Sequence, residues 1–325
     1  NMDYYSNGSN YPVESIRYSD PMILRDFRIV TIQINPFSYD ASTHQLTVKD
    51  NIQMRVNFTN TPGVNELPAP VQYISPSFDK VYQSIIQNYG DYRNFMVSNT
   101  PPRYLIIHGT TSIDANFTNA LDAFVLWKRQ KGADVDIATT ATNSAGNTTT
   151  TIQTYIRNRY NNPETRPDFV ILLGDTSGSY TIPYFTNNSG GSDYPFSFMN
   201  TGDILGDVFL GRISVENISQ LLVVLNKIYL YERDIDLTTA SWLNRMLLVG
   251  DNSPSGISTM YISKFIKEKA LEENPNYTFT ELYGPDFSSF VSSINAAFNQ
   301  GIGFHSYRGY IDHEPPAVDL LYNGF

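Results

Sequence analysis

The sequence of 325 residues contains no cysteine. This absence excludes disulfide bonds, thiolate metal sites and a cysteine nucleophile within these residues. Basic side chains are also scarce, because 22 Lys and Arg stand against 32 Asp and Glu and give a formal net charge of -10. Binding to phosphate groups needs clustered Lys and Arg, which this sequence lacks, so we expect no nucleic-acid partner.

Long apolar runs are missing as well. No run approaches the roughly 18 residues of a membrane-spanning helix, so we expect no membrane span. Asn1 does not open a signal peptide, so we expect any export signal to lie outside this chain. The hydrophobic fraction of 41% is ordinary for a folded protein, and this length allows two domains with substantial cores. The 23 Tyr and 19 Phe, with abundant Asn, Ser and Thr, are more typical of secreted or surface proteins than of cytosolic enzymes.

The first part of the chain predicts a small β domain. From Arg25 to Phe58, two stretches alternate apolar and polar residues around a turn-rich segment, which predicts an antiparallel hairpin with one buried and one solvated face. A linker rich in Pro and Asn follows from Thr59 to Pro70, and an amphipathic segment runs from Phe78 to Asn88. We therefore place the first domain at residues 1–70.

From Arg103 onward, short apolar runs alternate with helical patterns, an order typical of a parallel α/β sheet. The predicted strands are YLIIHG, ADVDIATT, DFVILLGD, DVFLGRIS, RMLLVGD, TFTELYG and GIGFHSY. The sequence therefore predicts an α/β fold with mainly parallel sheets, preceded by a small antiparallel β segment. We expect a first α/β unit over residues 71–240 and the start of a second over residues 241–325.

Two of these strands share one pattern, since FVILLGD ends at Asp175 and RMLLVGD ends at Asp251. The repeat indicates two similar units in tandem, or it reflects only that Gly-Asp is common where a parallel strand ends. Neither strand is followed by G-x-G-x-x-G or by a Gly-Lys-Ser/Thr loop, which argues against a nucleotide site.

Both aspartates lie where a carboxylate can orient a histidine, bind a metal or cap the next helix, and capping is the commonest of these roles for an isolated Asp. The four histidines are scattered and form no H-E-x-x-H motif, which argues against catalytic zinc. Asp203 and Asp207 could hold Ca²⁺, but no EF-hand spacing supports such a site. We expect that no cofactor is required.

The stretch HSYRGYIDHE, His305 to Glu314, contains two of the four histidines. The apolar run from Gly301 to Phe304 predicts a buried strand that stops at Gly309, and functional groups often lie at such strand ends. His305 inside the strand is also consistent with a core histidine, and His313 with a solvated loop histidine. His108 is similarly ambiguous, and His44 is expected at the surface of the hairpin turn.

These segments together resemble the gingipain family of cysteine peptidases, the C25 group secreted by Bacteroidetes-type bacteria. The resemblance extends over residues 103–325 through ALDAFVLWKRQKGADVDIA, FVILLGD, DVFLGRIS, KIYLYERD, MLLVGDNSPSG and INAAFNQGIGFHSYRGY. In addition, FRIVTIQINPFSYDASTHQLTVKDNIQMRVNF is similar to the end of the family's β-rich prodomain. The resemblance implies a prodomain followed by two caspase-like α/β subdomains, of which the second carries the active site.

Family members use a Cys thiolate, a His that activates it, an acid that orients the His, and backbone N–H groups that stabilise the oxyanion. The resemblance aligns Asp251 with the orienting acid. It aligns Tyr307-Arg308-Gly309-Tyr310 with the family's Tyr-x-Gly-His corner, so that Tyr310 stands at the histidine position and Gly309 shapes the oxyanion region. The family implies protein or peptide substrates, the chain's own prodomain and cell-surface secretion machinery as partners.

The sequence departs from the family in two respects. The nucleophilic Cys would lie on a later strand beyond Phe325, and Tyr310 replaces the base. A phenol with a pKa of about 10 is a poor base for a thiol of about 8.5. His313 could serve instead if its loop returns to the strand end, whereas His305, five residues before Tyr310, is expected on the opposite face. No acid stands at Ser258 or Thr259, so arginine specificity is not expected.

Two hypotheses follow from these residues. The first is a secreted or surface-attached bacterial cysteine endopeptidase precursor, in which this part of the chain alone cleaves nothing. The second is an inactive family member that serves as a structural, adhesive or assembly module on the cell surface.

Overall fold

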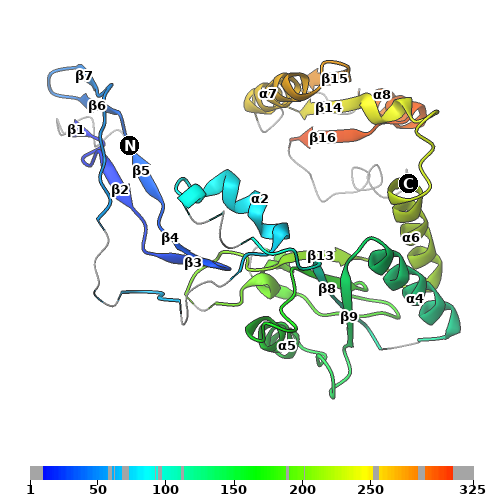
Figure 1. Ribbon diagram of the computed structural model, residues 1–325. Helices are drawn as coiled ribbons and strands as arrows, with labels where there is room; N and C mark the ends of the chain where they lie inside the picture. Colours follow the sequence, from blue (N-terminus) through cyan, green and yellow to red (C-terminus); the bar gives the residue numbers. More distant parts are fainter. Residues whose placement is uncertain are drawn as a thin grey trace. The chain divides into compact units, whose positions relative to one another are not determined.

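A computed structural model describes residues 10–57, 61, 63–67, 73–91, 93, 97–110, 113–187, 190–200, 202–251, 256–284 and 290–309. The chain divides into two compact units, residues 1–227 and 228–325, which are described separately (Figure 1). In the ranges just given, no helix is both long enough and apolar enough to cross a membrane. The predicted domains 1–70, 71–240 and 241–325 stay predictions.

The first unit begins with antiparallel strands in three small sheets. The strands are β1 (Asn10–Tyr11), β2 (Ile16–Tyr18), β3 (Met22–Leu24), β4 (Phe27–Ile29), β5 (Ile32–Ile34), β6 (Phe37–Asp40) and β7 (Gln45–Val48). The predicted hairpin is present as β6 and β7, which pair antiparallel from Phe37 with Val48 to Asp40 with Gln45. Its predicted buried face was wrong, because all four residues of β7 are exposed. Alternation produces burial only where a second layer covers the sheet, and among the described residues β7 has no such cover.

The main sheet of the first unit has four parallel strands in the order β13-β10-β8-β9. Their bounds are β8 (Arg103–His108), β9 (Asp134–Thr139), β10 (Phe169–Leu173) and β13 (Phe209–Ile213). The helices whose bounds the structure describes in this unit are α2 (Pro76–Ile85), α4 (Ala115–Gln130), α5 (Thr149–Asn161) and most of α6 (Ile218–Glu232). The remaining elements are the short hairpin of β11 (Phe185–Asn187) and β12 (Gly190–Ser192) and the 3-10 helix η1 (Tyr194–Ser197).

Local sequence signals begin the helices where they were expected. The side chain of Asp114 accepts a hydrogen bond from the backbone N–H of Phe117 at 2.8 Å and starts α4. Thr148 and Thr151 form a reciprocal capping box at the start of α5. One face of the sheet then packs Leu105 and Leu172 in the same buried cluster as helix α5.

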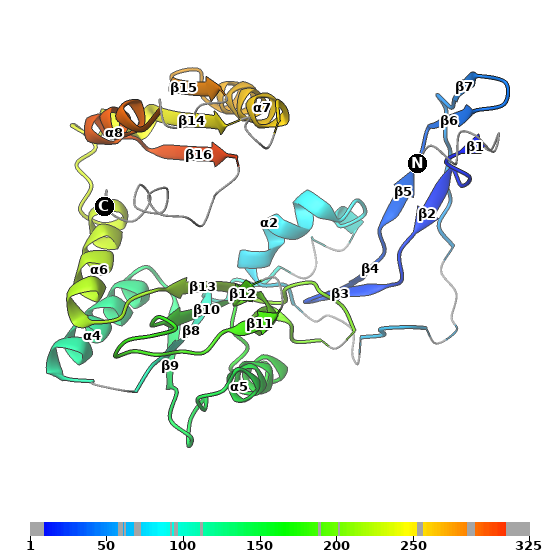
Figure 2. The same ribbon diagram turned by 180° about the vertical axis from the view of Figure 1, so that it is seen from behind.

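A second hydrophobic cluster joins the early strands to the main sheet. It contains Leu24 of β3, Phe78 and Tyr82 of α2 and, partly buried, Phe209 of β13. The rings of Phe78 and Phe209 stack with their centroids 4.4 Å apart. Figures 1 and 2 both show α2 beside β13 and the β3–β4 hairpin. Residues far apart in the sequence therefore share one core.

The second unit contains a three-stranded parallel sheet in the order β15-β14-β16. Its elements are η2 (Ser241–Asn244), β14 (Arg245–Asp251), α7 (Ser258–Glu273), β15 (Thr278–Gly284), α8 (Val291–Gln300) and β16 (Phe304–Arg308). Strand β16 starts later than the predicted run from Gly301, because Gly301 has a φ of +82° and its N–H donates to Phe298, ending α8. Phe304 is 45% exposed rather than buried.

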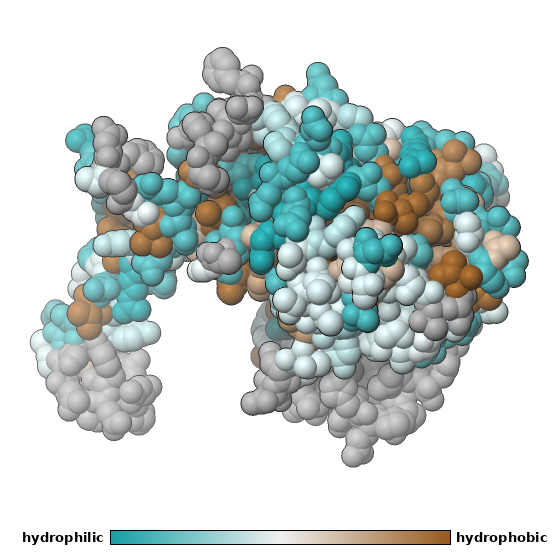
Figure 3. Space-filling view, turned by 90° about the horizontal axis from the view of Figure 1, so that it is seen from below, coloured by the Kyte–Doolittle hydropathy of each residue, from teal (hydrophilic) through white to brown (hydrophobic). Residues whose placement is uncertain are grey.

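The order of elements confirms the predicted fold class, mainly parallel α/β sheets preceded by antiparallel strands. Large apolar side chains remain at the surface in places, including Leu222 and Val223 of α6. The face in Figure 3 shows hydrophobic residues in separate patches among hydrophilic and weakly polar ones.

Candidate functional site

The second unit places Asp251 at the carboxyl end of its central strand. Strand β14 is buried from Met246 onward, and Asp251 at its end is 4% exposed. In the neighbouring strands, Gly284 of β15 pairs with Asp251 and Arg308 of β16 pairs with Gly250. A buried carboxylate at a strand end is costly unless hydrogen bonds or charges compensate it, so its neighbours decide what it can do.

Tyr307 of β16 is one such neighbour. Its hydroxyl donates a hydrogen bond to the carboxylate of Asp251. Burial, followed by the negative charge of Asp251 and this hydrogen bond, raises the pKa of Tyr307. The phenol therefore stays protonated and acts as a donor at neutral pH, because a nearby anion and a bond to the neutral form both oppose its ionisation.

Gly309 closes over this pair. A Cβ added to Gly309 would lie 2.5 Å from the hydroxyl oxygen of Tyr307 and 2.8 Å from Cβ of Asp251. Real Cβ atoms do not approach neighbours this closely, so the position fits only glycine. We refer to Asp251, Tyr307 and Gly309 as the Asp251 corner.

His305 lies two residues before Tyr307 in β16. Its ring meets that of Phe298 in α8 edge-on, with centroids 5.3 Å apart. Its Nε2 is buried and, within the described ranges, has no hydrogen-bond partner. Burial lowers the pKa of His305. It therefore behaves as a neutral ring packed on a helix.

Tyr310 and His313 lie outside the described residues. The expectation that His305 and Tyr310 are on opposite faces therefore stays a prediction. Thr259, where no acid was found, is fully buried, and its hydroxyl donates to the backbone oxygen of Gly256 at 3.0 Å. Of the predicted site residues, the structure thus brings Asp251 and Gly309 together.

Sequence reasoning missed Tyr307 as a partner of Asp251. The available signal was the period of two along a strand, which places Tyr307 of β16 and Gly309, the residue after its end, on the same side. What it could not supply was the pairing of β16 with β14, which sets Tyr307 opposite Val249 and close to the strand end.

The corresponding aspartate of the first unit has a different environment. Asp175 follows β10, and its carboxylate accepts a hydrogen bond from the hydroxyl of Ser214 at 2.8 Å. Of the three roles left open for Asp175, helix capping is not observed, because the next described helical segment, η1, begins only at Tyr194. Asp251 does not cap α7 either, since Ile257 occupies the N-cap position of that helix.

The other histidines have local partners. His108 is 7% exposed, its Nδ1 lies 2.7 Å from the backbone oxygen of Gly109, and its ring contacts Phe117. Burial lowers the pKa of His108, as expected of a core histidine. His44 is exposed in the β6–β7 turn, 3.1 Å from the hydroxyl of Tyr39.

The two aspartates considered for calcium accept hydrogen bonds from the protein itself. The carboxylate of Asp207 accepts backbone N–H bonds from Arg25, Met199 and Asn200. That of Asp203 accepts the N–H of Ile23 at 2.9 Å. Over the residues that the structure describes, no group of three or more His, Asp or Glu side chains converges as metal ligands would.

Two family models match this sequence. The model of peptidase family C25 matches residues 97–315, and the C25 propeptide model matches residues 1–96. Together they span most of the chain.

Curated relatives agree with these matches. Lys-gingipain from Porphyromonas gingivalis is 26% identical over 307 residues, covering 88% of this chain and 16% of that protein. Gingipain R2 from the same species is 25% identical over 314 residues, covering 94% of this chain and 41% of that protein. The chain thus spans less than half the length of these relatives.

Solved structures show the same likeness. The Arg-specific cysteine proteinase gingipain R matches with a TM-score of 0.53 and 24% identity, covering 66% of this chain and 48% of that one. A complex of Porphyromonas gingivalis RgpB pro- and mature domains matches with a TM-score of 0.53 and 25% identity, covering 65% and 48%. These matches confirm the predicted caspase-like α/β fold.

Proposed function

Because the chain belongs to peptidase family C25, we propose that it is part of a cysteine endopeptidase precursor, secreted by a bacterium or held on its surface. The match to the family's propeptide over residues 1–96, directly before the match to its peptidase, supports a precursor. Its substrates would be proteins or peptides, and its first partner would be its own prodomain. Export would require surface secretion machinery, and the chemistry would need no cofactor.

The observation that carries this proposal is the Asp251 corner. A carboxylate offers about four lone-pair sites, so Asp251 can accept the Tyr307 hydroxyl and still accept an N–H from a base. That base would be His313, held in one orientation by Asp251 so that it can take the proton of a thiol. The nucleophilic Cys would lie beyond Phe325, because residues 1–325 contain none.

Gly309 would contribute through its backbone. A peptide bond attacked by a thiolate develops an oxyanion, and backbone N–H groups stabilise it when no side chain intervenes. A glycine that lies against Asp251 keeps such a position open. Asp251 would act as a positioning residue for the base, and the turn at Gly309 would shape the oxyanion region.

Tyr310 favours a second candidate function, an inactive family member that serves as a structural, adhesive or assembly module. Its phenol stands where the resemblance places the base. A phenol of the ordinary pKa of about 10 is protonated at neutral pH, so it would accept the proton of a thiol of about 8.5 only after a large shift.

Labelling of the full-length protein with a thiol-directed activity probe tests both candidates. The peptidase proposal expects labelling that is lost in His313→Ala and kept in Tyr310→Phe. Asp175→Asn is the matched control for Asp251→Asn, and only the latter should slow labelling. A full-length protein that takes no label would sink the peptidase proposal and leave the inactive module.

A further inference from the structure

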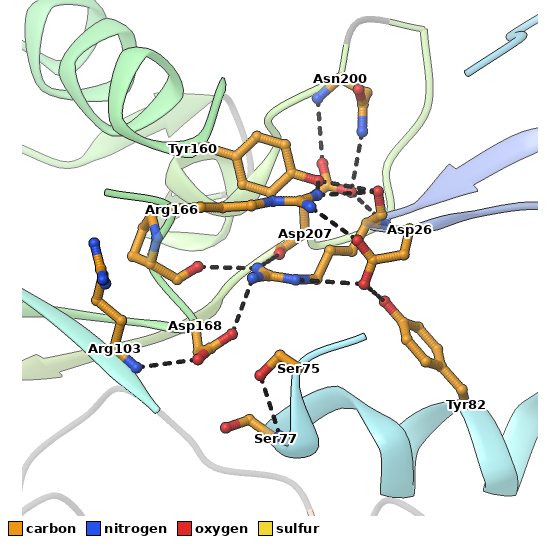
Figure 4. Close-up of polar contacts among 12 residues, drawn as sticks. Asp26, Ser75, Ser77, Tyr82, Arg103, Tyr160, Arg166, Asp168, Asn200 and Asp207 are labelled. Carbon is orange, nitrogen blue, oxygen red and sulfur yellow. Dashed lines mark hydrogen bonds and ion pairs between the residues drawn. The ribbon is translucent and has the colours of Figure 1, made fainter. Parts of the chain in front are cut away.

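The tight turn between β3 and β4 places two charged side chains against residues that precede strands β10 and β13 of the first α/β sheet. Arg25 and Asp26 are 5% and 4% exposed, although they belong to a short hairpin. Arg25 has a φ of +50°, a left-handed conformation that only the tight turn explains. Figure 4 shows the polar contacts around this turn, which we call the Arg25 anchor (Arg25 and Asp26).

The guanidinium of Arg25 is held on several sides. Its Nη1 donates to the backbone oxygens of Pro167 at 2.9 Å and Asp207 at 2.8 Å. Its Nη2 donates to Oδ1 of Asp168 at 2.9 Å. The ring of Phe78 covers it, with its centroid 4.4 Å from the guanidinium carbon. A planar donor set of this kind fits arginine and not lysine.

Asp26 supplies the negative charge of the turn and binds a cation and a hydroxyl group. Its Oδ1 accepts from Nη1 of Arg166 at 2.9 Å, and its Oδ2 accepts from the hydroxyl of Tyr82 at 2.8 Å. The cation of the turn thus meets Asp168, and the anion of the turn meets Arg166. Arg25 and Asp26 therefore form ion pairs with Asp168 and Arg166, respectively, the two residues that flank Pro167.

The backbone of the turn is recognised too. The N–H of Arg25 donates to Oδ1 of Asp207 at 2.7 Å, and its carbonyl oxygen accepts from the hydroxyl of Tyr160 at 3.1 Å. Burial raises the pKa of Tyr160 to about 12, so this hydroxyl remains a donor at neutral pH. One residue thus has its N–H, its carbonyl and its side chain bound by the same surface.

This surface belongs to the first unit, whereas the Asp251 corner belongs to the second. Asp168 directly precedes β10, and Asp207 lies two residues before β13, so both mark the amino ends of parallel strands in the first unit. The Asp251 corner is at the carboxyl end of a strand in the second unit. The turn belongs to the propeptide match and the surface to the peptidase match.

We propose that Arg166, Pro167, Asp168 and Asp207 form a docking site for the Arg25 anchor, and that this contact keeps residues 1–96 bound after the chain between the two parts is cut. The inference rests on the proposed function only in treating residues 1–96 as a removable propeptide. The buried ion pairs make the contact specific, because a chain that lacks one partner would leave the other charge buried and uncompensated.

The test uses the full-length protein with a site for a sequence-specific protease inserted at exposed Asn99–Pro101. After cutting, the two parts are expected to co-elute from a size-exclusion column at neutral pH. Separation of the cut wild-type protein would overturn the proposal. The measurement does not depend on peptide hydrolysis, so an inactive peptidase leaves it intact.

Variants locate the contact. Arg25→Ala and Asp168→Asn each leave a buried charge or donor unpaired, which is expected to weaken binding of the cut parts about 100-fold or more. Arg28→Ala is the matched control, because Arg28 lies three residues away in β4 and donates to Val64 within the propeptide match. If Arg25→Ala binds as tightly as Arg28→Ala, the proposal fails.

A double-mutant cycle separates docking from general folding. Uncut Arg25→Ala must first show the circular dichroism of the wild type; if it does not, Arg25→Lys replaces it, since it keeps the charge but loses the forked donor set. The double variant combines Arg25→Ala with Asp168→Asn. Its two cut parts are expected to bind each other no more weakly than those of the single variant with the larger loss, because the two residues share one contact. Fully additive losses would contradict a shared docking contact.

Discussion

A Gly-Asp pair stands at the carboxyl end of an interior strand in each α/β unit, directly after β10 in the first and as the last two residues of β14 in the second, but the two aspartates have different surroundings. Asp175 is half-buried and accepts a hydroxyl from Ser214, which follows the adjacent strand β13. Asp251 is almost fully buried and accepts the phenol of Tyr307. The local sequence signal is the same in both units, and the adjacent strand decides whether the carboxylate becomes part of a candidate site.

The glycines of the two pairs also differ, and they give the largest expected effect. Gly174 has a φ of +148°, and an added Cβ would lie 1.9 Å from the backbone oxygen of Tyr180. Gly174→Ala is expected to destabilise the first unit by about 3 kcal/mol, because backbone strain and overpacking add. Gly250→Ala should cost about 1 kcal/mol, since its Cβ would meet the backbone of Met260 at 3.1 Å. Urea unfolding measures both.

Gly211→Ala is the control for this pair of variants. Gly211 lies in β13 and an added Cβ there meets nothing within 4 Å. Its unfolding midpoint is expected to stay within the error of the wild type. Equal losses at positions 174 and 211 would contradict the steric explanation.

Replacing the aspartates themselves sharpens the comparison further. Asp251→Ala leaves the hydroxyl of half-buried Tyr307 without its acceptor and is expected to cost about 2 kcal/mol. Asp251→Asn keeps an acceptor oxygen and should cost clearly less. Asp175→Ala is expected to cost less than about 1 kcal/mol, because the Ser214 hydroxyl reaches water. Thermal unfolding of the three variants measures this order, and an Asp175 effect as large as that of Asp251 would contradict it.

The Tyr307–Asp251 hydrogen bond predicts a difference at alkaline pH. The pKa of Tyr307 is raised in the folded protein, so its stabilising effect is complete below about pH 10, where the unfolded tyrosine begins to ionise. Above that pH the unfolded state loses its proton first, and the effect is lost as pH rises toward the folded pKa. Wild type is therefore expected to be more stable than Tyr307→Phe at pH 8 and to lose this advantage above pH 10. A difference that does not change between pH 8 and pH 11 would contradict the assignment.

Much of this fold could be predicted because its strands are short apolar runs bounded by turns. The strands ending at His108, Leu173 and Asp251 were predicted within a residue or two. The exposed face of β7 could not be predicted, because its alternation of Leu46 and Val48 is the same whether or not a second layer covers it.

The candidate site was predictable only in part for a related reason. Asp251 ends β14 and Gly309 directly follows β16, and strand ends can be recognised along the sequence. Their contact with Tyr307 depends on which strands are neighbours. The Arg25 anchor was not predictable at all, since its partners Asp168 and Asp207 lie 143 and 182 positions away along the chain. No local pattern distinguishes such an Arg-Asp pair from a solvated turn.

The smallest expected effect concerns the two buried histidines, one in each unit. Burial lowers the pKa of both His108 and His305, but among the described residues His108 alone of the two has its Nδ1 bonded to a backbone oxygen. His305→Leu is therefore expected to change stability by less than about 1 kcal/mol at pH 7.5, because no protein hydrogen bond is lost among the described residues.

At acid pH, the difference in stability between wild type and His305→Leu should change in favour of the variant. The folded pKa lies below the unfolded value of about 6.5, so wild type loses stability as the unfolded histidine takes up a proton below that pH. His305→Leu lacks this proton uptake and should become the more stable protein at pH 5. His108→Leu should lose stability at pH 7.5, because it also removes the bond to Gly109. Thermal unfolding at the two pH values measures the stability of both variants. If His305→Leu loses as much stability as His108→Leu at pH 7.5, the prediction that His305 makes no stabilising hydrogen bond is wrong.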